Sequence, residues 1–66
     1  MELRINGEAR SVEGAATVAE LIELFGLGGR RIAVELNERI VPRTRHDETP
    51  LGEGDRIEIV HAIGGG

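Results

Sequence analysis

The segment that decides the fold is TVAELIELFG, residues 17–26. Its apolar residues are spaced at i, i+3, i+4 and i+7, on one face of an α-helix: Val18, Leu21, Ile22 and Phe25. Thr17 and Glu20 have the spacing of a capping box, in which each side chain accepts a hydrogen bond from the backbone N–H of the other residue. Gly26 suits the left-handed conformation that ends many helices. The segment predicts an amphipathic helix of about nine residues.

A β-hairpin is predicted before this helix. Apolar and polar residues alternate over residues 1–5, which is the period of a strand with one buried face. Asn6 and Gly7 form a strong signal for a two-residue turn, so a second strand is predicted at residues 8–12.

The chain after the helix is predicted to return to strands. Residues 32–36 alternate in the same way, and a turn at residues 37–38 leads into a short segment at residues 40–41. Residues 43–50 are polar and are predicted to be irregular. The last strand is predicted at residues 56–62.

The order of elements is therefore hairpin, helix, strand, short strand and strand. One short helix cannot cover both faces of a four- or five-stranded sheet, so one face stays open to solvent. This order is typical of the α+β class and of the β-grasp (ubiquitin-like) fold, a mixed sheet with one helix across one face. We expect a β-grasp domain over residues 1–63 and a flexible glycine tail at residues 64–66.

Side-chain alternation predicts what each face of the sheet carries. His61 is expected at the margin of the core, and His46 is expected to form a solvated loop pair with Asp47. The predicted core combines the apolar helix stripe with the inward strand positions: Leu3, Ile5, Val18, Leu21, Ile22, Phe25, Ile32, Val34, Leu36, Ile57 and Ile59. The predicted open face carries Glu2, Arg4, Glu58, Val60 and Ala62.

Composition excludes several classes of partner. The chain has 12 acidic and 8 basic residues, for a formal net charge of −4, and every basic residue is arginine. Because nucleic-acid and anionic membrane surfaces attract basic proteins, we expect neither as a partner. The sequence has no cysteine. Disulfides and thiolate metal sites are therefore not expected. We expect a cytoplasmic location.

The body of the chain has no recognisable catalytic constellation, so we do not expect an enzyme. Ser11 is the only serine and lies in a predicted strand, and there is no cysteine nucleophile or lysine for a Schiff base. His46 and His61 lack the spacing of a zinc site, so no metal is expected. The glycines of residues 26–31 follow a helix and precede a strand, the reverse of a dinucleotide-binding loop.

The remaining candidate is the tail, Gly64, Gly65 and Gly66. A terminal α-carboxylate is ionised at neutral pH and can attack the α-phosphate of ATP in a second protein. Glycine leaves the carbonyl unhindered and lets the backbone enter a narrow site. Three extended residues span at most about 11 Å.

Three segments resemble a known family: ATVAELIELFGL, IAVELNERIVPR and GDRIEIVHAIGGG. They are similar to the small sulfur-carrier proteins of thiamine biosynthesis, the ThiS-like family, and the resemblance covers essentially the whole chain. It implies that a ubiquitin-activating-type adenylyltransferase adenylates the Gly66 carboxylate. Sulfur from a donor such as a cysteine desulfurase would then replace AMP to form a thiocarboxylate, and thiazole synthase would receive the sulfur. No cofactor is expected on the chain itself, because the partner consumes the ATP.

Other readings stay open at this point. The small sulfur-carrying subunit of molybdopterin synthase uses the same tail chemistry, and a ubiquitin-like modifier or a plain β-grasp interaction module would share the fold. We also expect Val60 and Ala62, apolar residues on the open face, to dock the activating enzyme.

Overall fold

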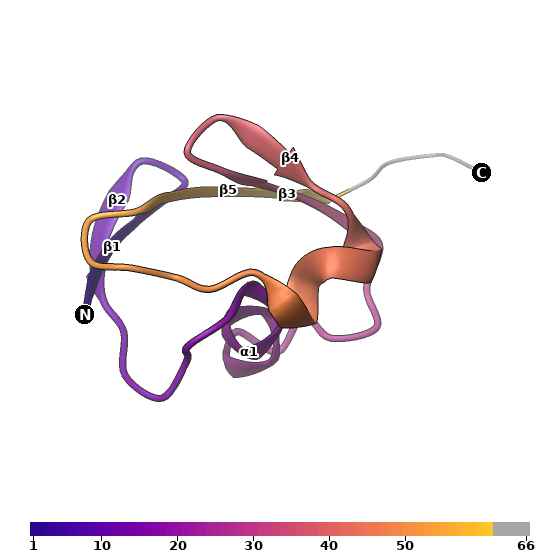
Figure 1. Cartoon of the computed structure of the whole chain (residues 1–66), viewed down its shortest axis with the longest axis horizontal. Coiled ribbons are helices and arrows are strands. Elements are labelled where there is room, and N and C mark those ends of the chain that lie inside the picture. The colour runs from indigo at the N-terminus through magenta and orange to yellow at the C-terminus, as the bar shows by residue number, and fades with distance from the viewer. Residues whose placement is uncertain (62–66) are drawn as a thin grey trace.

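The fold is known from a computed structural model that describes residues 1–61 (Figure 1). Five strands form one sheet in the order β2-β1-β5-β3-β4, and α1 crosses one face of it. The elements in chain order are β1 (Glu2–Ile5), β2 (Glu8–Ser11), α1 (Val18–Leu24), β3 (Ile32–Leu36), β4 (Arg39–Val41), the 3-10 helix η1 (Arg43–Glu48) and β5 (Arg56–His61). Only the β1–β5 pair is parallel among these strands. The predicted mixed sheet with one covered face is confirmed.

Turn and cap residues behave largely as predicted. Asn6 and Gly7 both have positive φ, 51° and 83°, as a tight hairpin turn between β1 and β2 requires. The helix is two residues shorter than predicted, because Phe25 already caps it and Gly26 follows with φ 73°. Gly26 donates to the Glu23 carbonyl at 3.0 Å, which satisfies an orphan acceptor of the last turn.

The start of α1 departs from the capping box in one bond. The Thr17 hydroxyl accepts from the Glu20 backbone N–H at 3.2 Å, as predicted. The Glu20 carboxylate instead accepts from the N–H of Ala16 at 2.7 Å, one residue before the cap. The box therefore also fixes the chain that enters the helix.

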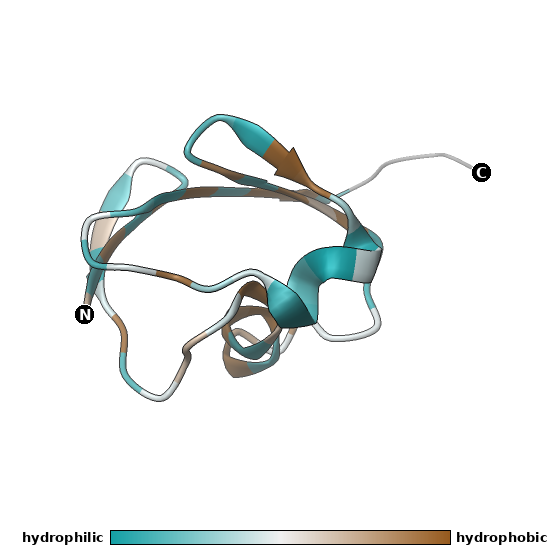
Figure 2. Cartoon of the chain, in the orientation of Figure 1, coloured by the Kyte–Doolittle hydropathy of each residue, from teal (hydrophilic) through white to brown (hydrophobic). Residues whose placement is uncertain are grey.

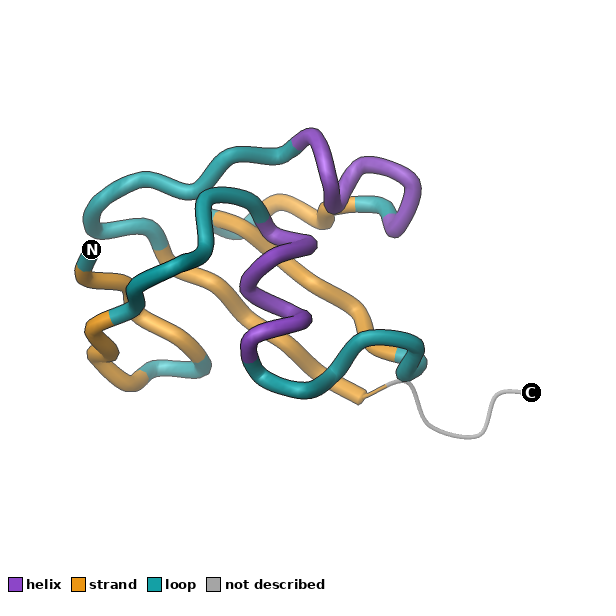
Figure 3. Tube along the Cα trace, turned by 90° about the horizontal axis from the view of Figure 1, so that it is seen from below, coloured by secondary structure: helices purple, strands orange, loops and turns teal. Residues whose placement is uncertain are grey.

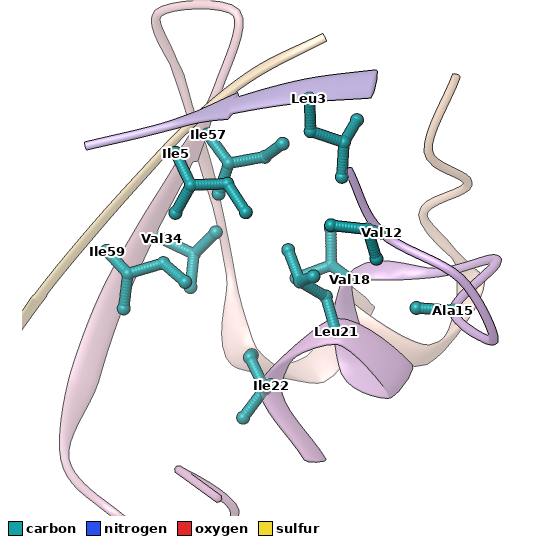
Figure 4. Close-up of a cluster of buried hydrophobic side chains, with 10 residues drawn as sticks. All are labelled: Leu3, Ile5, Val12, Ala15, Val18, Leu21, Ile22, Val34, Ile57 and Ile59. Carbon is teal, nitrogen blue, oxygen red and sulfur yellow. The ribbon is translucent and has the colours of Figure 1, made fainter. Parts of the chain in front are cut away.

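The core lies between α1 and the covered face of the sheet (Figure 4). Strand residues such as Ile57 and Leu3 point toward Leu21 of the helix, and Leu21 and Ile57 are fully buried. The predicted core residues Phe25, Ile32 and Leu36 are only half-buried, since they lie at the edges of this layer. Three further hydrophobic residues are buried that the helix and strand patterns did not predict: Val12, Ala15 and Val41.

The predictions for the two histidines and for residues 43–50 are corrected. Residues 43–48 form η1 rather than an irregular loop. His46 is buried, not solvated, because η1 turns its ring inward and its Nε2 lies 3.0 Å from the Val41 carbonyl oxygen. His61 is exposed rather than packed at the core margin, since it is the last residue of β5 and lies beyond the residues that the helix covers.

Within residues 1–61, no helix has the length and apolar character needed to cross a membrane.

Candidate functional site

The predicted reactive end follows β5. Ala62 and the glycines of residues 64–66 lie outside the described residues, which end at His61. In the described part, β5 lies between β1 and β3 in the middle of the sheet (Figure 3). Its last residue, His61, pairs with Ile32. The pairing of β5 with β1 ends at Ile57, so the pairing with β3, which continues to His61, fixes the point where the tail joins the domain.

Asn6 extends this support beyond the end of β1. Its side-chain Oδ1 accepts from the Ile59 N–H at 2.8 Å, and its Nδ2 donates to the Ile59 carbonyl at 3.2 Å. The amide thus bonds to β5 as one more strand residue would, two residues from the end of that strand. The local sequence predicted only the turn at Asn6, because no local pattern reveals a contact 53 residues away.

The open face carries an apolar patch beside the end of β5, which we call the open-face patch (Ala33, Ile40 and Val60). Val60 lies directly opposite Ala33 across the β3–β5 pair, and its side chain is 55% exposed. Ile40 of β4 is 75% exposed, and in Figure 2 β4 changes from hydrophilic at its start to hydrophobic toward its end. The predicted exposure of Val60 is confirmed, whereas Ile40 was missed because a three-residue strand is too short to show alternation.

Two carboxylates border this patch. Glu35 lies opposite Glu58 across the β3–β5 pair and opposite Ile40 across the β3–β4 pair, and both glutamates are exposed. Like charges directly opposite each other on a sheet destabilise it slightly. This face therefore combines apolar area with two opposed carboxylates.

The histidines do not form a site. Within residues 1–61 there is no group of three or more His, Asp or Glu side chains arranged to hold a metal ion. His46 lies inside η1 and His61 is exposed at the end of β5, so the structure does not assign them a common role.

A five-stranded mixed sheet crossed by one helix, with its central strand leading into the glycine tail, defines a ubiquitin-like β-grasp protein. Comparison with known proteins identifies the family. A family model described as the ThiS family matches residues 3–66. The chain belongs to the ThiS family.

Full-length relatives support this assignment. The sulfur carrier protein ThiS of Bacillus subtilis (strain 168) is 34% identical over 65 residues, covering 97% of this chain and 98% of the relative. The crystal structure of the thiamine biosynthesis protein ThiS from Geobacter metallireducens superposes with a TM-score of 0.86 at 33% identity over the whole of both chains. The β-grasp fold and the predicted resemblance are both confirmed.

A second kind of relative is much longer. A thiazole synthase of Paramagnetospirillum magneticum is 42% identical over all 66 residues of this chain, which cover 20% of that protein. The chain therefore spans about a fifth of the length of the thiazole synthases that it matches.

Proposed function

We propose that this protein is a sulfur carrier for thiazole formation in thiamine biosynthesis. The observation that carries the proposal is similarity over nearly the full length to proteins named sulfur carriers, including that of Escherichia coli, for which the alignment covers 100% of both chains. The match to the ThiS family favours this role over that of a molybdopterin synthase subunit. In this proposal the protein acts in the cytoplasm as a carrier of sulfur and as the substrate of a partner enzyme, rather than as a catalyst.

The reactive group in this proposal is the Gly66 carboxylate. One of its oxygens attacks the α-phosphorus of ATP on a ubiquitin-activating-type adenylyltransferase, and the bond to pyrophosphate breaks. The terminal sulfur of a persulfide on a donor such as a cysteine desulfurase then attacks the acyl carbon and AMP leaves, which gives an acyl disulfide. A partner thiol attacks the donor-side sulfur of this disulfide, so the S–S bond breaks and the donor cysteine ends in a disulfide with that thiol. The product is a thiocarboxylate on Gly66. The carrier binds no cofactor, because the partner binds and consumes the ATP.

The glycine tail and the two residues before it supply reach and access in this scheme. Residues 62–66, if fully extended, span at most about 18 Å, which is enough to enter a buried active site while the folded domain stays outside. Gly65 and Gly66 have no side chain to hinder attack at the carbonyl carbon. Gly64 lengthens the segment without side chains.

The open-face patch is the proposed docking surface for the adenylyltransferase. It extends the expected pair Val60 and Ala62 to Ile40, which is the most exposed large apolar residue among those described. The opposed carboxylates Glu35 and Glu58 favour a partner with a basic residue at this position.

Thiazole synthase is the proposed recipient of the sulfur. The support is that relatives named thiazole synthase contain a segment alignable with all of this chain. A carrier joined to its recipient in one chain transfers its cargo at a high effective concentration. A separate carrier would have to dock the same enzyme by diffusion.

Intact mass spectrometry tests the proposed function. The protein is incubated with ATP, the adenylyltransferase of the same organism and a sulfur source, and then measured whole and after proteolysis. We expect the mass increase for one oxygen replaced by sulfur, located on the C-terminal fragment and dependent on ATP. No increase, or an increase on another fragment, would contradict the proposal.

A further inference from the structure

Two separate segments bring arginines to the end of β5. Arg30 and Arg31 close the loop between α1 and β3, and Arg31 directly precedes Ile32, the partner of His61. Arg43 begins η1 directly after β4. Figures 1 and 3 show both segments at the end of the molecule where β5 finishes. We call these three residues the arginine cluster (Arg30, Arg31 and Arg43).

A hydrogen bond joins the two segments. The Arg43 guanidinium donates from Nη2 to the backbone carbonyl of Arg30 at 3.2 Å. The bond holds the start of η1 against the loop, so the cluster belongs to the fold rather than to two independent loops. Arg30 contributes only its carbonyl to this bond, which leaves its own guanidinium out of it.

The cluster is a local positive region on an acidic protein. All three arginines are exposed, whereas the chain as a whole has a formal net charge of −4. The neighbouring Arg45 forms an ion pair with Glu48 at 4.0 Å. Within residues 1–61, neither Arg30 nor Arg43 forms an ion pair with a carboxylate. Their charges are therefore available to another molecule.

The distance from the end of β5 to a bound ATP limits which molecule the arginine charges can act on. If the tail carries its carboxylate into an active site, the ATP phosphates lie up to about 18 Å from the end of β5. At physiological ionic strength the Debye length is about 8 Å, so exposed charges act weakly over that distance. The arginines instead lie where the domain would meet the surface around the entrance of the site.

We propose that the arginine cluster is a docking surface for an acidic rim around the cleft that admits the tail in the adenylyltransferase. The proposal rests on the proposed function, because it presumes that the tail enters a partner. The cluster is distinct from the open-face patch: it lies on the α1–β3 loop and at the start of η1 and contributes charge, whereas the patch contributes apolar area. Charge of this kind mainly raises the rate of association and orients the encounter.

The test measures ATP–pyrophosphate exchange catalysed by the adenylyltransferase of the same organism, with this protein as the varied substrate. Arg30→Glu reverses one charge and keeps the carbonyl that Arg43 uses. We expect kcat/KM to fall about tenfold at low salt with kcat unchanged, and the deficit to shrink as salt is raised. Arg43→Lys, which keeps the charge, is expected to stay within about twofold of wild type.

Arg39→Glu is the matched control, because it makes the same change in net charge at the other end of the sheet. Arg39 is exposed and pairs with Leu36, which lies opposite Ile57, about 13 Å along β5 from His61. The proposal is overturned if Arg39→Glu lowers kcat/KM as much as Arg30→Glu, or if Arg30→Glu has no effect. A loss in Arg30→Glu that is confined to kcat would overturn it as well. If the wild-type protein supports no exchange at all, the proposed function fails, and the docking proposal fails with it.

Discussion

Asn6 shows how much one side chain can do in a domain this small. Its positive φ of 51° is tolerated by asparagine better than by most residues, which makes it a turn residue. The same side chain then forms both a donor and an acceptor bond with Ile59, near the end of β5. This position therefore needs a residue that tolerates a left-handed backbone and whose side-chain amide both donates and accepts a hydrogen bond.

Two substitutions separate these requirements. Asn6→Gly keeps the turn and removes both bonds to Ile59, and we expect it to lower the free energy of unfolding by about 1–3 kcal/mol. Asn6→Asp also tolerates the turn and keeps the acceptor for the Ile59 N–H, but it faces the Ile59 carbonyl with oxygen instead of a donor. We expect a loss of at least about 1 kcal/mol.

Urea unfolding followed by circular dichroism measures both variants. Amide exchange of Ile59 gives a local readout, and we expect its protection to fall more in Asn6→Gly than in Asn6→Asp. If Asn6→Gly is as stable as wild type, the amide bonds do not contribute to the anchoring of β5.

At the scale of elements, the two faces of the sheet differ in what covers them. The covered face packs on α1, and the open face presents the open-face patch from β3, β4 and β5. If that patch docks the adenylyltransferase, a charge within it should raise KM without unfolding the domain. Val60→Asp tests this, and we expect kcat/KM for adenylation to fall about tenfold or more, the size of an interface residue whose loss costs over 1 kcal/mol.

Leu24→Asp is the matched control for Val60→Asp. Leu24 lies on the helix and is 53% exposed, close to the 55% of Val60, so both variants place a carboxylate on an equally exposed apolar site. We expect Leu24→Asp to leave the adenylation kinetics near those of wild type. Equal kinetics in the two variants would remove the open face as the docking surface.

Elements with a strong local pattern could be predicted from the sequence, and those without one could not. The helix stripe and the Asn6–Gly7 turn carry their signal within a few residues, so their positions were predicted closely. By contrast, η1 has no apolar period, and the burial of His46 depends on a carbonyl from β4. The candidate site divides in the same way: Val60 follows from alternation, whereas Ile40 needs the pairing of β4 with β3.

At the scale of the whole molecule, the proposed function assigns folding and sulfur chemistry to different parts of the chain. The buried hydrophobic residues extend from Leu3 to Ile59, within the described residues. A protein of this length has a typical stability of roughly 3–10 kcal/mol. Leu21→Ala would remove about 2–5 kcal/mol of it, because Leu21 is fully buried between the helix and the sheet.

The complementary variant lacks Gly65 and Gly66. Because these residues follow the last core residue by several positions, we expect the melting temperature to change by less than about 2 °C. We also expect the mass increase for sulfur to vanish entirely, since the penultimate and acceptor glycines are gone. Leu21→Ala should show the opposite combination: a lower melting temperature and, at temperatures where it remains folded, sulfur loading at the wild-type rate. Sulfur loading of the truncated chain would place the modified group elsewhere and contradict the assignment of Gly66.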